Sequence, residues 1–167
     1  MTLPVVNLLE VPAEVADEDA TWNTKQGTPH NTPVFVHVAP ERSEMTVAQT
    51  DYLRDHLDTF ENALYGFYAR DPVLGYAPFI NADSFVDHFL LRTFSKEKDG
   101  LVLSEHYYID RDGKINMGPV WDFDLSSGYS DDPTRGPEGW SWRSPERVWR
   151  GGWFLGLLSD PNFAQKV

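Results

Sequence analysis

The stretch HYYIDRDGKINMGPVWDFD, residues 106–124, predicts a β-hairpin that ends in two aspartates. Two β-rich runs, 106–109 and 115–123, flank Asp112-Gly113. An Asp-Gly pair between such runs is typical of a tight two-residue turn. The prediction of the fold therefore starts from this hairpin and its acidic end.

The two aspartates at the end of this hairpin are the strongest chemical signal. Asp122 and Asp124 lie two positions apart in an apolar setting, so both would point to one face of a regular strand. Buried like charges are costly unless a cation or hydrogen-bond donors lie between them, and a hard cation such as Mg²⁺ suits carboxylate oxygens. On spacing alone, a strand end whose acids cap backbone amides or meet arginines explains the pair equally well.

Two amphipathic helices are predicted upstream of the hairpin. Thr46 followed by Gln49 fits a capping box at the start of the first helix. The second helix is predicted from Asp83, and Pro72 and Gly75 separate the two. The inward stripes are Leu53, Leu57, Phe60, Leu64 and Phe67 in the first helix, and Phe85, Val86, Phe89, Leu90 and Phe94 in the second.

The two ends of the chain complete a mixed α+β pattern. Apolar runs at 5–11 and 34–38 predict strands among short extended pieces. Residues 126–152 are rich in glycine and proline and read as a loop that carries three tryptophans, Trp140, Trp142 and Trp149. A last helix is predicted to start at Ser159 or Asp160, with Pro161 at its first helical position.

Composition excludes several classes of function. The 167 residues suggest one domain or a piece of one, and 26 acidic against 14 basic side chains give a formal charge of −12. Such a field repels nucleic acids and anionic membranes, and no apolar run approaches the roughly 18 residues of a membrane helix. No signal peptide opens the chain, and the compartment stays open. The absence of cysteine excludes disulfides, thiol catalysis and cysteine-bound metals.

The remaining chemical candidates are weak when each is taken alone. Asp99, in SKEKDG, reads as part of an ordinary charged turn. Residues 110–113 resemble a calcium loop only faintly, and a plain hairpin turn is the better interpretation. The five histidines have no metal-binding spacing, and neither a nucleophile elbow nor a Gly-rich phosphate loop is present.

The segment GPVWDFDLSSG, residues 118–128, is similar to the G-P-V-W-D-F-D-L-x-x-G signature of the CotH family. These are spore-coat and secreted proteins with an atypical kinase fold. Shorter similarities extend over most of the chain, at 8–10, 24–27, 34–41, 83–87, 104–108 and 157–163. The resemblance implies an α+β fold like the C-terminal lobe of an atypical protein kinase, and a location outside the cell or on the spore or cell surface.

The resemblance implies that the chain is a partial kinase-like domain over residues 1–167, with the N-terminal lobe missing before Met1. Its expected parts are strands and turns (1–45), two helices (46–95), the catalytic and metal hairpin (99–128), and a tryptophan-rich loop with a terminal helix (129–167).

The resemblance also assigns roles to individual residues. Asp99 matches the family's catalytic aspartate, and Asp122 matches its Mg²⁺ ligand. Ser104, five positions after Asp99, falls where protein kinases carry a second metal ligand, and Asp124 completes the metal site or orients Asp122. Lys25 is a conceivable phosphate contact.

The implied activity is Mg²⁺-dependent transfer of the γ-phosphoryl group of ATP to a protein Ser or Thr, and the acidic charge suits a basic substrate segment. One departure is Glu97, which replaces the family's Asn and is expected to add negative charge beside Asp99. The alternatives are a pseudokinase or extracellular module that holds a glycan or protein with its tryptophan loop. A glycosidase is a third alternative and needs two carboxyl groups, such as those of Glu97 and Asp122, about 5 to 10 Å apart across a cleft.

Overall fold

The computed structural model describes residues 6–12, 21–24, 34–97, 100–101, 103–110, 113–127 and 152–167. Its strands are β1 (Val6–Val11), β2 (Thr21–Asn23), β3 (Val34–Ala39), β4 (Glu105–Asp110) and β5 (Ile115–Met117). Its α-helices are α1 (Val47–Tyr65), α2 (Ala82–Ser95), α4 (Gly152–Leu158) and α5 (Pro161–Ala164), with short 3₁₀ turns at Arg42–Glu44 and Ala77–Phe79. The predicted α+β class is confirmed.

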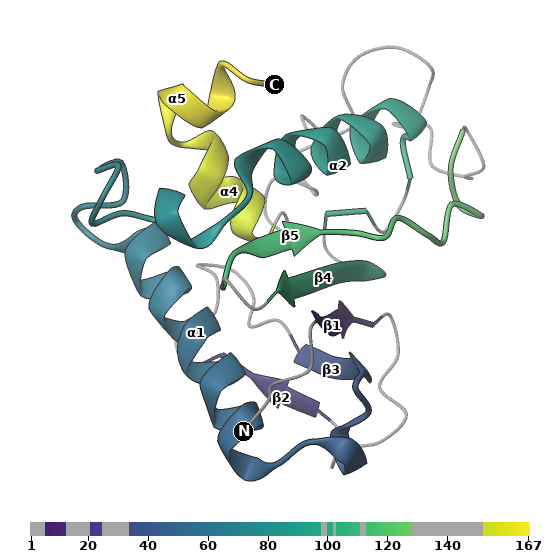
Figure 1. The fold of residues 1–167 in the computed structure, drawn as a ribbon. Helices are drawn as coiled ribbons and strands as arrows, with labels where there is room; N and C mark the ends of the chain where they lie inside the picture. The colour runs from purple at the N-terminus through teal and green to yellow at the C-terminus, as the bar shows by residue number, and fades with distance from the viewer. Residues whose placement is uncertain are drawn as a thin grey trace.

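The strands form one antiparallel sheet in the order β2-β3-β1-β4-β5. In β1, Leu9 lies opposite His37 of β3 on one side and Tyr107 of β4 on the other. Helix α2 packs against β5 at one edge of the sheet, and α1 runs along its flank and contacts α4 (Figure 1). Strands β1 and β3 form where the sequence predicts strands.

The hairpin of β4 and β5 differs from its prediction. Its last pair is Ile109 opposite Ile115, so the connection is longer than a two-residue turn, and Gly113 N donates to Asp110 O at 2.9 Å within it. The second strand is also shorter than predicted and ends at Met117. Gly118 N still donates to His106 O of β4 at 2.8 Å, but the φ of 118° at Gly118 and the missing N–H of Pro119 end the strand there. Asp122 and Asp124 therefore lie beyond any regular strand.

Helix α1 begins as predicted and ends early. Gln49 N donates to Thr46 Oγ1 at 3.3 Å, and Thr46 N donates to Gln49 Oε1 at 2.8 Å, which is the predicted capping box. The helix stops at Tyr65, before Gly66. The prediction that Phe67 faces the core is wrong, because it lies past the end of the helix and is 95% exposed.

Helix α2 buries most of its predicted stripe but not its last member. Phe85, Val86 and Phe89 are buried, whereas Phe94 is 84% exposed. The prediction for Phe94 is wrong because the inward face continues through Arg92 and Thr93.

The last helix starts as predicted, since Asp160 accepts a hydrogen bond from Asn162 N at 3.0 Å and Pro161 is its first residue. Helix α4, just before it, was not predicted. The tryptophans at 140, 142 and 149 lie outside the described residues.

The apolar core joins the sheet to the helices. Phe60 of α1 packs edge-on against Trp153 of α4, with ring centroids 4.9 Å apart, and Trp153 also stacks on Phe35 of β3. Other buried members include Leu9, Leu53, Leu57, Ile80, Phe85, Phe89, Ile109, Ile115, Phe154 and Leu157. Among the helices that the structure describes, none has the length and apolar character needed to cross a membrane.

His37 makes stability depend on pH. Burial, followed by the positive charges of Arg42 and Arg54, lowers the pKa of His37 from 6.5 to about 4. Because the folded state favours the neutral ring, this contribution is complete above pH 6.5 and is lost as the pH falls toward 4. We expect His37 to reduce the free energy of unfolding by about 2 kcal/mol between pH 7 and pH 5, as measured by urea denaturation.

The control for this prediction is His37→Gln. Burial also lowers the pKa of His56, so some loss of stability at low pH should remain in the variant. If wild type and variant lose the same free energy between pH 7 and pH 5, His37 is not the source.

Candidate active site

Two of the predicted metal ligands meet in the structure. Ser104 Oγ donates a hydrogen bond to Asp122 Oδ2 at 2.9 Å, although the residues are 18 positions apart. Ser104 is buried just before β4, and Asp122 is exposed in the segment that follows β5. One donor therefore fixes the direction of an accessible carboxylate.

Both residues have a left-handed backbone conformation that residues other than glycine rarely adopt. Ser104 has φ 55° and Asp122 has φ 58°, and Lys96 and Leu101 nearby also have positive φ. Such residues cost of order 1 kcal/mol each and cluster at functional sites, where the surroundings hold them. The local chain is therefore shaped by contacts rather than by its own preference.

Backbone bonds hold the Asp122 segment at both of its ends. Gly118 N donates to His106 O at 2.8 Å, and Ser127 N donates to Ser95 O at the end of α2 at 2.7 Å. Between them, the ring of Trp121 lies 5.1 Å from that of His106. The segment is thus fastened to β4 and to α2, with Asp122 between the two attachments.

A buried cluster of charged side chains lies beneath this pair. Arg92 of α2 is 1% exposed, and its Nη1 lies 3.4 Å from Glu97 Oε2 while its Nε lies 3.3 Å from Glu105 Oε1. His88 contacts both Arg92 and Glu105. The guanidinium also donates from Nη2 to the backbone oxygen of Ser104 at 2.7 Å and covers the Phe123 ring at 4.7 Å.

This cluster changes the interpretation of Glu97. Its carboxylate is buried and paired with Arg92, so its negative charge lies inside the protein beside a cation. The glycosidase alternative requires Glu97 to face Asp122 across an open cleft, and the buried pair with Arg92 contradicts that arrangement.

The donor set of Ser104 and Asp122 fits Mg²⁺. This ion is usually held by one or two carboxylates together with substrate phosphates and water, so a large protein cage is not needed. Within the described ranges, no group of three or more His, Asp or Glu side chains could hold a metal. Asp124 is exposed, and in this part of the chain no hydrogen bond joins it to Ser104 or Asp122.

Asp99 and Lys25, predicted as catalytic base and phosphate contact, lie outside the described residues. Their roles stay predictions. Sequence reasoning missed the cluster of Arg92, His88 and Glu105. One signal was available: His88 and Arg92 lie four apart on the face of α2 that carries Phe85 and Phe89, so buried partners could have been expected.

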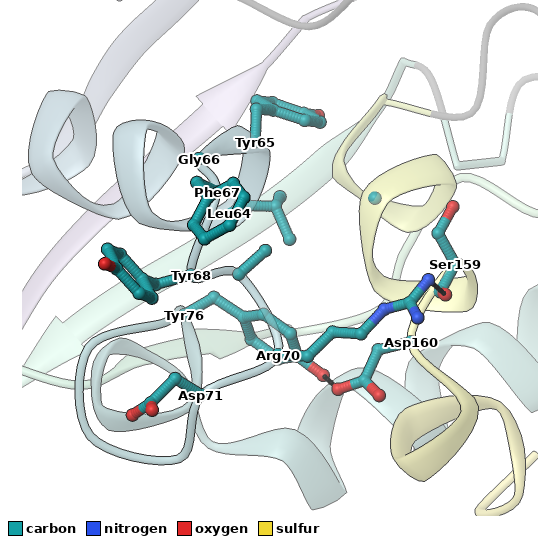
Figure 2. A pocket seen from close by; sticks show the side chains of 12 residues that line it. Leu64, Tyr65, Gly66, Phe67, Tyr68, Arg70, Asp71, Tyr76, Ser159 and Asp160 are labelled. Atoms are coloured by element: carbon teal, nitrogen blue, oxygen red, sulfur yellow. Dashed lines mark hydrogen bonds between the residues drawn. The ribbon is translucent and has the colours of Figure 1, made fainter.

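A separate cavity of about 650 Å³ lies at the end of α1 (Figure 2). Aromatic side chains of Tyr65, Phe67 and Tyr68 line one side. Arg70 and Asp160 line another, where Tyr76 donates to Asp160 at 2.7 Å. Of the predicted site residues, the three that the structure describes, Ser104, Asp122 and Asp124, do not line this cavity.

A protein-family model described as "CotH kinase protein" matches residues 15–167, which is most of the chain. The chain belongs to the CotH kinase family. The resemblance drawn from residues 118–128 is thereby confirmed, and a kinase-like protein is the function class that the family supports. No curated protein and no solved structure matches this CotH family member.

Gly100 tests the packing of the buried cluster. A Cβ at this position would lie 2.9 Å from Glu97 Oε2 and 3.0 Å from Arg92 Cδ. We expect Gly100→Ala to lower the free energy of unfolding by about 1–2 kcal/mol, because a packed interior resists an added methyl group. Denaturant unfolding measures this cost. A variant as stable as wild type would contradict the prediction, because it would show that the side chains of the cluster move aside without loss of stability.

Proposed function

We propose that this chain provides the metal- and substrate-binding part of an atypical protein kinase, equivalent to a kinase C-terminal lobe. The reaction is transfer of the γ-phosphoryl group of ATP to a Ser or Thr hydroxyl of a protein. The observation that carries this proposal is the hydrogen bond from Ser104 to Asp122, because it joins two predicted ligands within a family of kinase-like proteins.

Each residue has a defined part in this proposal. Asp122 holds Mg²⁺ through its exposed carboxylate, and Ser104 orients that carboxylate and offers its hydroxyl oxygen as a further ligand. Asp124 supports the metal site from the exposed turn, and Lys25 contacts the phosphates. Mg²⁺ bound to the nucleotide neutralises charge on its phosphate oxygens.

Asp99 is the proposed base. It orients the acceptor hydroxyl, whose oxygen forms a new bond to the γ-phosphorus while the bond from that phosphorus to the bridging oxygen breaks. The hydroxyl proton passes to Asp99, and the products are a phosphoester and ADP. The burial of Glu97 beside Arg92 supports this role, because the cation reduces the repulsion of phosphate by Glu97.

Nucleotide binding tests the metal site. We expect calorimetric titration to show ATP binding with Mg²⁺ and none with EDTA. Asp122→Asn should weaken binding about tenfold or more, equivalent to about 1.4 kcal/mol, because a charged ligand is lost. The control is Asp83→Asn. It removes an exposed carboxylate on α2, which pairs with Lys166 at a distance of 2.9 Å. Equal affinity in wild type and Asp122→Asn, or no Mg²⁺-dependent binding, contradicts the proposed site.

Phosphoryl transfer tests the acceptor. The formal charge of −12 supports a basic Ser- or Thr-containing segment as substrate, because opposite charges favour encounter. With radiolabelled γ-phosphate, basic peptides should be phosphorylated faster than acidic ones, and more so at low salt. Asp99→Ala should abolish transfer but keep Mg²⁺-dependent ATP binding. Equal rates on acidic and basic peptides would remove the charge argument and leave the kinase proposal in place.

A further inference from the structure

The guanidinium of Arg92 lies between the two stretches of chain that supply Ser104 and Asp122. From Nη2 it donates to Ser104 O at 2.7 Å, and its flat face lies 4.7 Å from the ring of Phe123, the residue next to Asp122. One rigid group thus contacts both halves of the candidate metal site.

The orientation of this group is fixed from its other edges. Glu97 Oε2 lies 3.4 Å from Nη1, and Glu105 Oε1 lies 3.3 Å from Nε. Glu105 Oε1 also accepts a hydrogen bond from Leu101 N at 2.8 Å. The guanidinium donors form a fixed planar fork, so carboxylates that hold Nη1 and Nε also determine where Nη2 and the flat face of the group lie.

Burial makes this arrangement hard to replace. Arg92, Glu97 and Glu105 are each about 1% exposed, so water cannot take over the bonds of a lost partner. The supported residue, Ser104, has φ 55°, a conformation that needs outside contacts to persist.

We propose that Arg92 is a positioning residue, which sets the separation of Ser104 and Asp122 and so the affinity of the site for Mg²⁺-bound nucleotide. Because Arg92 is buried, its proposed effect passes through Ser104 and Phe123 and not through direct contact with metal or nucleotide. The effect on affinity rests on the proposed function, whereas the positioning of the two segments can be measured without any ligand.

The experiment compares three forms with wild type. Arg92→Met alone removes the guanidinium that the buried carboxylates of Glu97 and Glu105 share, and this variant can fail to fold. The second form, Arg92→Met with Glu97→Gln and Glu105→Gln, also removes the two carboxylate charges, so we expect it to fold, but it still lacks the guanidinium. The third is Tyr76→Phe, a control that breaks the buried Tyr76–Asp160 bond away from the site. All folded forms are compared well below their melting temperatures.

Hydrogen exchange is the readout that needs no ligand. The triple variant should exchange faster than wild type and Tyr76→Phe in peptides that cover residues 113–127, where Ser127 N bonds to Ser95 O. Peptides from α1 should exchange at the wild-type rate. Unchanged exchange over 113–127 in the triple variant would overturn the proposal.

ATP titration with Mg²⁺ is the second readout. The triple variant should bind between about 10- and 100-fold more weakly, as for other residues that orient metal ligands, while Tyr76→Phe keeps wild-type affinity. Wild-type affinity in the triple variant overturns the positioning role. If wild type itself does not bind, the proposed function fails, and the exchange result alone then supports or overturns the role of Arg92 in holding the two segments.

Discussion

A single buried cation constrains the part of the structure that carries the candidate site. A guanidinium that is 1% exposed has lost nearly all its water, so its donors and its charge must be satisfied by the protein. Arg92 meets this demand from four directions, with Glu97, Glu105, the backbone of Ser104 and the ring of Phe123. Helix α2, the chain before β4 and the segment after β5 must therefore come together.

This arrangement explains how an exposed site can be precise. Asp122 must stay accessible to hold a metal with nucleotide phosphates, so packing cannot fix its side chain directly. Its segment is instead tied to β4 through Gly118 and to α2 through Ser127, and its carboxylate takes a bond from buried Ser104. The unfavourable backbone conformations at 104 and 122 are kept by these neighbours, as is common where geometry serves function.

The sequence predicts best what depends on neighbouring residues. The capping box of Thr46 and Gln49, Pro161 at the start of the last helix and the inward Phe85 and Phe89 are local patterns, and all are confirmed. The errors arise where contacts between residues far apart in the sequence determine the structure. Phe67 and Phe94 fit a helical period but lie beyond the packed faces, and the hairpin turn is longer than the Asp-Gly pair indicates. The meeting of Ser104 and Asp122 followed only from the family resemblance. The spacing of His88 and Arg92 was a local signal, but the contacts of Arg92 with Ser104, Glu105 and Phe123 join residues too far apart for a local pattern.

The pairing of Glu97 with Arg92 bears on how departures from a family pattern should be judged. Taken from the sequence, a carboxylate in place of Asn adds charge close to where phosphates are expected to bind. In the fold, that carboxylate is turned inward and bonded to a cation that also supports Ser104. An amide at position 97 would leave Arg92 facing one carboxylate, that of Glu105, in place of two. Glu97 and Arg92 therefore form one buried pair, and the carboxylate at position 97 lies inside the cluster, in contact with a cation.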